Sequence, residues 1–193
     1  MTKVPLLGYA LLGLIHQKPS SGYDLRKTFA ETAMGNYSDS PGAIYPALER
    51  LESQGLVRGV IEDSAGLRRR RLYRITPKGV AELKTWLSRP LVQSDIMRSA
   101  NESMLRFAFV ETVLGGDAAV KFLEQFRAIV KQYVAELESY WNANSAKMPL
   151  SGSLALDCGI RGYRSLQEWA THAIRTYQQA KTTKSSRSSG GRS

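Results

Sequence analysis

Five arginines lie within a seven-residue segment of this chain, and their type and spacing suit the binding of an anion. They are Arg68, Arg69, Arg70, Arg71 and Arg74. Like charges packed this closely repel one another, and a nucleic-acid backbone or minor groove would relieve that repulsion. A charge run alone is more often only a solvated surface, so its interpretation depends on the elements around it.

A second group of candidate binding residues comes earlier, in a helix predicted from Ser40 to the stop at Gly55. Ser40 followed by Pro41 is typical of an N-cap and a first helical residue. Apolar residues at helical spacing, Ile44, Leu48 and Leu51, form the expected buried face. The residues left facing outward or near the start are Ser40, Gly42, Ala43, Tyr45, Pro46, Glu49 and Arg50.

The start of this helix has the chemistry of a DNA-reading helix. Small residues permit close approach to bases and phosphates, and Tyr45 and Arg50 can hydrogen-bond to phosphate. The alternative is an ordinary solvated helix with a buried Tyr45. Pro46 lacks an N–H group, so if Pro41 is the first helical residue we expect a kink or a cost of about 3 kcal/mol at Pro46. Such a broken local rule often marks a functional surface.

The flanking segments predict the order of a winged helix-turn-helix. Helices are expected over residues 5–16 and 21–35, before the helix of residues 40–55. Residues 56–75 alternate as a hairpin, the wing, which carries the arginine run, and residues 76–90 form a fourth helix. Ser21 with Asp24, and Thr76 before Pro77, are the capping signals for the second and fourth helices.

The second half predicts an all-helical domain. One helix is expected over residues 101–114 and another, capped by Asp117, to about Asn144. A last helix is expected through residues 163–177, and residues 181–193 contain no apolar residue, which predicts a disordered tail. In the long helix a heptad stripe must be buried, either by a second copy of the chain or in a monomeric bundle. The stripe consists of Leu123, Phe126, Val130, Tyr133, Leu137 and Tyr140.

Charge separates the same parts of the chain. The net charge is +10, and residues 1–90 carry 14 lysines and arginines against 8 acidic residues. Residues 91–180 carry 9 of each, and residues 181–193 carry 4 basic and no acidic residues. We therefore predict a DNA-binding domain over residues 1–90, a helical domain over 91–180 and a basic tail, because phosphate neutralisation is the general source of affinity for DNA.

Several other classes of protein are disfavoured. The single cysteine, Cys158, excludes an internal disulfide, and with only His16 and His172 we expect no metal site and no cofactor. No apolar run approaches a membrane span, so we expect a cytoplasmic protein. No nucleophile elbow, phosphate loop or catalytic pair is recognisable, which argues against an enzyme. We expect Cys158 to be a buried small side chain.

Residues 5–87 closely resemble the PadR family of phenolic-acid-responsive transcriptional regulators. The residues that carry the resemblance are Leu6-Leu7-Gly8, Pro19 with Gly22-Tyr23-Asp24-Leu25, the segment Pro41 to Leu48, Arg50-Leu51-Glu52, Gly55-Leu56-Val57 and the segment Arg71 to Gly79. The later residues resemble the longer type of the family less tightly, through Met104 to Phe109, Gly159-Ile160 and Trp169.

The resemblance implies a homodimer held by the C-terminal helices, a palindromic double-stranded DNA operator, and repression of a neighbouring gene. It also implies an effector pocket between the two domains that takes a small aromatic, phenolic-acid-like compound. The alternative is a winged-helix DNA-binding or architectural protein without an effector.

For the effector the sequence offers five candidates. Arg106, beside Phe109, could pair with a carboxylate, and Arg161 and Tyr163 lie where glycines thin the last helix. Ion pairs within or between protomers are the alternative for both arginines. His16 lies at the polar end of the first helix, where an interface role is favoured over a switch.

Overall fold

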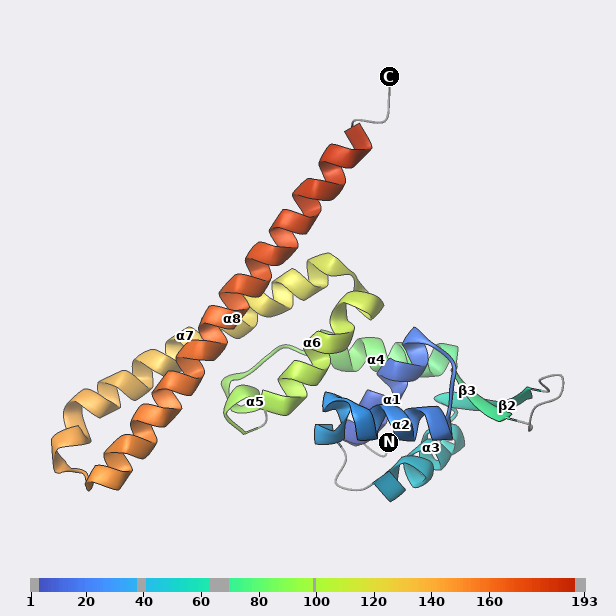
Figure 1. The fold of residues 1–193 in the computed structure, drawn as a ribbon, viewed down its shortest axis with the longest axis horizontal. Helices are drawn as coiled ribbons and strands as arrows, with labels where there is room; N and C mark the ends of the chain where they lie inside the picture. Colours follow the sequence, from blue (N-terminus) through green and yellow to red (C-terminus); the bar gives the residue numbers. More distant parts are fainter. Residues whose placement is uncertain (1–3, 38–40, 63–69, 99, 190–193) are drawn as a thin grey trace. The chain divides into compact units, whose positions relative to one another are not determined.

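The computed structural model describes residues 4–37, 41–62, 70–98 and 100–189 (Figure 1). It divides into two compact units. The first comprises Met1–Arg89 and Met104–Leu114, and the second comprises Pro90–Ser103 and Gly115–Ser193. The first unit therefore takes in residues 104–114, which we had placed with the C-terminal domain.

The first unit is mainly helical with a small antiparallel sheet, which confirms the predicted fold class. Two segments of 3₁₀ helix, Ala33–Tyr37 and Pro41–Ala43, separate its second and third helices. Its other elements up to Ser88 are α1 (Leu6–Gln17), β1 (Ser20–Ser21), α2 (Gly22–Glu31), α3 (Ile44–Ser53), β2 (Val57–Glu62), β3 (Arg70–Ile75) and α4 (Pro77–Ser88).

Local capping signals set the starts of α2 and α4 as the sequence predicts. The Ser21 hydroxyl accepts a hydrogen bond from the Asp24 N–H at 3.1 Å, and the Asp24 carboxylate accepts one from the Ser21 N–H, which completes a capping box at α2. Thr76 caps α4 by accepting from the Gly79 N–H at 3.0 Å. Gly55 follows α3 with φ of +71°, a conformation that glycine adopts without strain.

The sheet has the order β1-β3-β2, with β3 in the middle. β2 and β3 form the predicted hairpin, and Val57 pairs with Ile75 and Gly59 with Tyr73. β1 is a two-residue strand whose Ser20 lies opposite Tyr73. Two residues are too short to show alternation, so the sequence contained no signal for this third strand.

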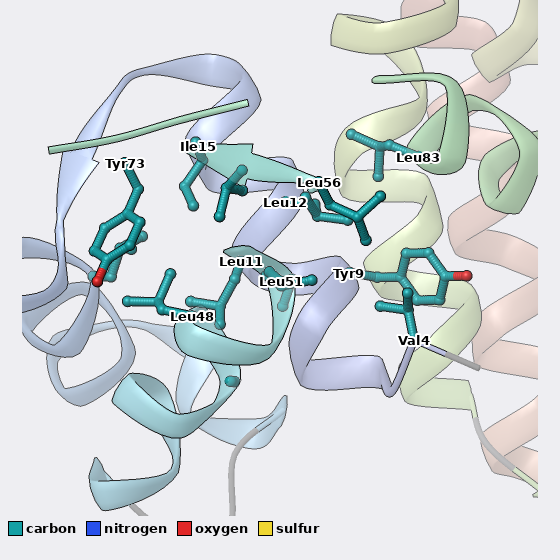
Figure 2. Close-up of a cluster of buried hydrophobic side chains, with 14 of the residues drawn as sticks. Val4, Tyr9, Leu11, Leu12, Ile15, Leu48, Leu51, Leu56, Tyr73 and Leu83 are labelled. Carbon is teal, nitrogen blue, oxygen red and sulfur yellow. The ribbon is translucent and has the colours of Figure 1, made fainter. Parts of the chain in front are cut away.

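A single apolar core holds the first unit together (Figure 2). Leu11 and Leu12 of α1 are completely buried, and Leu48 of α3 and Leu83 of α4 are buried with them. The Tyr9 ring stacks on Trp86 with centroids 4.3 Å apart. Because α1 is buried along most of its length, it is the central element against which the helices and the sheet are fixed.

Residues 104–114 join this unit as the larger part of α6 (Ala100–Leu114). The Phe109 ring lies against α1 at Gly13, where a Cβ atom would come within 2.5 Å of the ring. Leu105 and Phe109 are buried in the same core as Leu11. Only a residue without a side chain permits this approach. The contact joins two residues far apart in the chain, so no local pattern predicts that α6 packs on α1.

The second unit is helical. Besides the first residues of α6, it contains α5 (Gln93–Arg98), α7 (Gly116–Asn144), a 3₁₀ turn (Ser145–Lys147) and α8 (Leu150–Ser189). The N-cap of α7 is Gly115, with φ of +93°, and not Asp117, which lies in the first turn. The prediction of Asp117 as the cap was wrong by two residues, because glycine alone takes this backbone conformation without strain.

α7 and α8 pack along the predicted stripe. Phe126 meets Trp169 edge to face at 6.0 Å, and Tyr133 meets Tyr163 in the same manner at 4.9 Å. Leu123, Phe126 and Val130 are buried, whereas Tyr140 at the end of the stripe is exposed. The structure thus buries the first part of the stripe within one chain and leaves its end uncovered.

The backbone of α8 continues to Ser189, beyond residue 181, where we expected disorder to begin. A helix already nucleated by packing adds one hydrogen bond for each further residue, so polar residues can extend it. Residues 190–193 lie outside the described residues.

Candidate nucleic-acid interface

The candidate DNA-reading helix begins later than predicted. A 3₁₀ turn covers Pro41–Ala43, and α3 starts at Ile44 with Ala43 as its N-cap. Pro46 is therefore the third helical residue, where no intrahelical partner exists for an N–H group. The expected kink or cost of about 3 kcal/mol at Pro46 was wrong, because that cost applies to a helix interior.

α3 has a buried face and an open face. Ile44, Ala47 and Leu48 are buried in the core. Tyr45 is 46% exposed, which excludes the alternative of a buried tyrosine, and Pro46 and Arg50 are exposed beside it. The apolar face anchors the helix rigidly, and the opposite face is left to meet another molecule.

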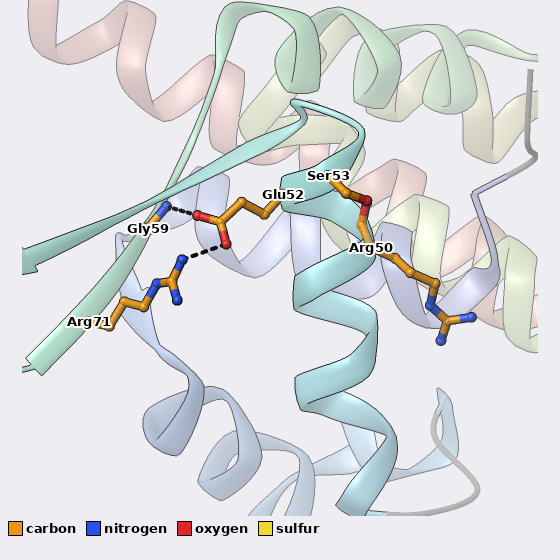
Figure 3. Close-up of polar contacts among 5 residues, drawn as sticks. All are labelled: Arg50, Glu52, Ser53, Gly59 and Arg71. Atoms are coloured by element: carbon orange, nitrogen blue, oxygen red, sulfur yellow. Dashed lines mark hydrogen bonds and ion pairs between the residues drawn. The ribbon is translucent and has the colours of Figure 1, made fainter.

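The residues before α3 extend this open face. Gly42 is exposed and Ala43 is half-buried. Arg50 donates from Nε to the Pro46 carbonyl at 3.2 Å, so its terminal nitrogens remain directed outward, on the other side of α3 from Glu52 (Figure 3). Ser40, which we predicted to contact DNA, lies outside the described residues.

The Tyr45 ring also ties α3 to the start of α2. A Cβ atom on Gly22 would lie 2.6 Å from the ring atom Cε1 of Tyr45, so the two helices approach through a position without a side chain. Glycine is required at Gly22 for space and not for its backbone angles. Tyr45 is thereby oriented while nearly half of its surface stays open.

α2 presents a partly basic surface of its own. Tyr23 is 55% exposed, and the Arg26 guanidinium lies 5.8 Å from the centre of its ring. Lys27 and Glu31 form an exposed ion pair at 3.9 Å one turn further along. These residues line a shallow depression on the helix surface. The sequence-based predictions did not include this surface as a binding site.

Strand alternation sends the wing arginines to opposite faces of the hairpin. Arg70 and Arg74 point to one face, and Arg71 points to the other with the buried Tyr73. Arg74 pairs with Glu62 at 2.6 Å. Arg68 and Arg69 lie outside the described residues.

One arginine of the wing was missed by the sequence analysis. Arg58 of β2 is exposed and lies directly opposite Arg74 in the register. Arg58, Arg70 and Arg74 therefore share one face, here called the outer wing face, with Glu62 as the only acidic side chain that β2 and β3 place there. The signal that could have found Arg58 is the strand register, because Arg58 lies 12 residues before the centre of the run.

Arg71 is engaged on the inner side of the hairpin (Figure 3). Its Nη2 donates to Glu52 Oε2 at 2.7 Å, and Glu52 Oε1 accepts from the Gly59 N–H at 2.8 Å. The hydrogen bond from Gly59 and the pair with Arg71 hold the pKa of the Glu52 carboxyl below its usual value. The Arg71 guanidinium lies 5.6 Å from the centre of the Tyr73 ring, and burial raises the pKa of Tyr73.

Asp24, at the start of α2, is held ionised mainly by Ser21. Its pKa is lowered chiefly by the hydrogen bond from the Ser21 hydroxyl, with a smaller contribution from the charge of Arg70. Arg70 is exposed and makes no ion pair with any residue of the described ranges. It is thus available to an external anion.

The effector candidates of the first unit lie in or beside its core. Arg106 is 1% exposed and donates from Nη2 to the carbonyl oxygens of Leu87, at 3.1 Å, and Arg89, at the end of α4. Phe109 is buried against α1. His16 is half-buried, and its buried Nδ1 has no hydrogen-bond partner among the described residues.

The effector candidates of the second unit lie on α8. Arg161 is exposed and pairs with Asp157 at 2.7 Å one turn away, as in the ion-pair alternative. Tyr163 is half-buried against Tyr133, and burial raises its pKa. Cys158 is exposed, so the prediction of a buried thiol was wrong, because α8 packs on α7 through another face.

The described ranges hold neither a candidate metal cluster nor a membrane-spanning helix. They contain no cluster of three or more histidine, cysteine or acidic side chains that could hold a metal ion. None of the helices described there is long and apolar enough to cross a bilayer.

Comparisons with known proteins place the first unit among transcriptional regulators. Residues 11–85 match the model of the "Transcriptional regulator PadR-like family". Over 122 residues the chain is 28% identical to the "Negative transcriptional regulator PadR" of Bacillus subtilis, covering 63% of this chain and 66% of that protein, just under two thirds. Over 190 residues it is 24% identical to the "Probable transcriptional regulator Rv1176c" of Mycobacterium tuberculosis, covering 90% of this chain and 98% of that protein.

Among solved structures, the "Crystal structure of Bacillus subtilis PadR in complex with operator DNA" aligns with a TM-score of 0.41 and 23% sequence identity. The alignment covers 89% of this chain and 98% of that chain.

Proposed function

Because this chain belongs to the PadR-like family of transcriptional regulators, we propose that it binds a palindromic double-stranded operator as a homodimer and represses transcription there. One observation carries the proposal, namely the two-faced α3. Its inner face is fixed in the core, and Tyr45, Pro46 and Arg50 are open on its outer face beside the wing.

This geometry suits the major groove. An α-helix fits the groove, whose base edges display a distinct donor and acceptor pattern for each base pair. Gly42 and Ala43 permit close approach, the Tyr45 hydroxyl and the Arg50 guanidinium can donate to phosphates, and the outer wing face supplies further positive charge. Repression in particular is supported by the name of the Bacillus subtilis relative, a negative transcriptional regulator.

Exposed apolar side chains in the second unit support the homodimer. Tyr140 of α7 and Leu150 and Leu154 of α8 are 54%, 76% and 58% exposed. All three belong to the end of α7 or the start of α8, on either side of the turn that joins these helices, and exposed apolar groups gathered in one region are typical of an interaction surface. A two-fold dimer would also present two copies of α3 to the two halves of a palindrome.

The operator proposal is tested by selecting duplexes from a randomised library with the wild-type protein and measuring binding by fluorescence anisotropy. We expect a palindromic selected sequence, bound far more tightly than a scrambled duplex of equal length. Tyr45→Phe should weaken binding to the selected duplex several-fold, as expected for one lost hydrogen bond, without changing the dimer. Failure to enrich any sequence would refute the proposal.

The effector is the finer part of the proposal: a small aromatic, phenolic-acid-like compound releases the protein from DNA. It is supported by the family resemblance. The second candidate, a regulator without an effector, is favoured by Arg106, whose guanidinium is already engaged by the α4 carbonyls. Adding a panel of aromatic acids to the complex with the selected duplex separates the two, since release supports an effector and indifference across the panel supports its absence.

A further inference from the structure

Glu52 links three elements of the proposed DNA interface, namely α3, β2 and β3. It lies on α3, and its two carboxylate oxygens accept hydrogen bonds from the Gly59 N–H of β2 at 2.8 Å and from Arg71 of β3 at 2.7 Å (Figure 3). We propose that Glu52 and Arg71 are positioning residues that lock the wing to α3, and that Arg71 keeps this pairing when the protein is on DNA. The inference rests on the proposed function.

The Gly59 hydrogen bond links the backbone of the wing to α3. β2 is an edge strand of the sheet, so one side of its backbone has no neighbouring strand. An unpaired edge N–H would otherwise depend on water. Glu52 supplies the acceptor from the helix, and α3 and the wing are thereby joined through the backbone as well as through a side chain.

The lock also requires that position 59 has no side chain. A Cβ atom there would lie 2.3 Å from Arg71 Nε and 2.9 Å from Glu52 Oε1. The Arg71 side chain therefore crosses from the middle strand over Gly59 to reach α3. Gly59 has no positive φ, so glycine is required here because a side chain would not fit, and not for its backbone angles.

Charge explains why Arg71 should stay paired on DNA. The Glu52 side chain is 28% exposed, and an unpaired carboxylate beside a phosphate backbone would be repelled. Arg71 neutralises it, so the pair as a whole contributes no net charge to DNA binding. The arginines of the outer wing face lie on the other side of the hairpin, where the lock leaves them open.

Glu52→Gln distinguishes the lock from simple electrostatics by the sign of its effect. The substitution raises the charge by one, so electrostatics alone predicts tighter binding to any DNA. The lock predicts binding to the library-selected duplex that is about five- to tenfold weaker, with little change on the scrambled duplex. A protein that is merely destabilised would lose binding to both duplexes in proportion.

Glu62→Gln is the matched control. Like Glu52→Gln, it raises the charge by one. The ion pair that it removes joins Glu62 to Arg74 within the hairpin and does not reach α3. We expect it to bind both duplexes as tightly as the wild type or more tightly. Weakening by Glu62→Gln equal to that by Glu52→Gln would overturn the lock.

Two further measurements complete the test. Glu52→Gln combined with Arg71→Gln removes the pair without changing the net charge, so it should leave the dependence of binding on salt unchanged, whereas loss of a phosphate contact by Arg71 would reduce the slope by about 0.9 per contact. Such a reduction would overturn the inference. Hydrogen exchange without DNA should show the Gly59 amide exchanging faster in Glu52→Ala, which removes the acceptor that a glutamine oxygen would keep, and unchanged exchange would also overturn it. If the wild type prefers no duplex, the proposed function fails, and the exchange experiment still decides whether the lock exists.

Discussion

Replacing Arg58 and Arg70 by alanine removes two of the three arginines of the outer wing face. Both side chains are exposed, and neither forms an ion pair with a residue in the described part of the chain. Neither belongs to the core, so the fold should survive the change. If these arginines bind phosphates, their loss should appear in the salt dependence of DNA binding before it appears anywhere else.

The magnitude follows from counterion release. Each phosphate contact contributes about 0.9 to the slope of log K against log salt, so two arginines in each protomer of a dimer contribute about 3.6. Between about 50 and 200 mM salt, the wild-type affinity should fall roughly 150-fold further than that of the variant. Binding to all sequences should weaken together, because phosphates carry no direct sequence information.

The assay is a salt titration of anisotropy binding curves with the library-selected and the scrambled duplex. The matched control is Lys121→Ala with Arg175→Ala, which makes the same charge change on exposed residues of α7 and α8. The control should retain the wild-type slope. A double variant with the wild-type slope would remove Arg58 and Arg70 from the interface, and a control that lowers the slope equally would show that only net charge matters.

Three other predictions concern the scaffold. Gly13→Ala should destabilise the protein by about 1–3 kcal/mol because the new methyl group meets the Phe109 ring. Gly159→Ala, with no atom near its Cβ position, should instead stabilise it by up to about 1 kcal/mol. Equal denaturation midpoints for the two variants would contradict this. Arg106→Met should cost about 2–4 kcal/mol by removing the hydrogen bonds to the α4 carbonyls, and an unchanged urea midpoint would show that they contribute nothing. The lowered pKa of Glu52 stabilises the folded protein, and this contribution is complete above the ordinary carboxyl pKa of 4.5 and lost as pH falls through the folded pKa. The wild type should therefore lose more stability in acid than Glu52→Gln. Parallel profiles of stability against pH would argue against this contribution.

Much of the fold could be predicted because its signals are local. The capping box of Ser21 and Asp24 and the cap of Thr76 act over three residues, and Gly55 ends α3 by its own backbone angle. Apolar spacing identified the inner face of α3, and alternation identified the hairpin. Each of these determinants is complete within one turn or one strand.

Parts of the candidate site were not predictable because they depend on partners far apart in the chain. Glu52 and Arg71 are 19 residues apart, and nothing local distinguishes Arg71 from Arg70. Arg58 belongs with the wing arginines only through the strand register. Pro46 was assigned a cost that the actual start of α3 removes.

The residues by themselves determined that the first ninety positions form a winged helix-turn-helix with a basic wing and an open-faced third helix, because periodicity, capping and charge are written in neighbouring residues. Only the tertiary structure decided which arginine faces outward, that Arg106 serves the end of α4, and that residues 104–114 belong with the first unit. Those outcomes depend on which side chains meet across the core and the sheet, and that is set by packing between segments distant in sequence.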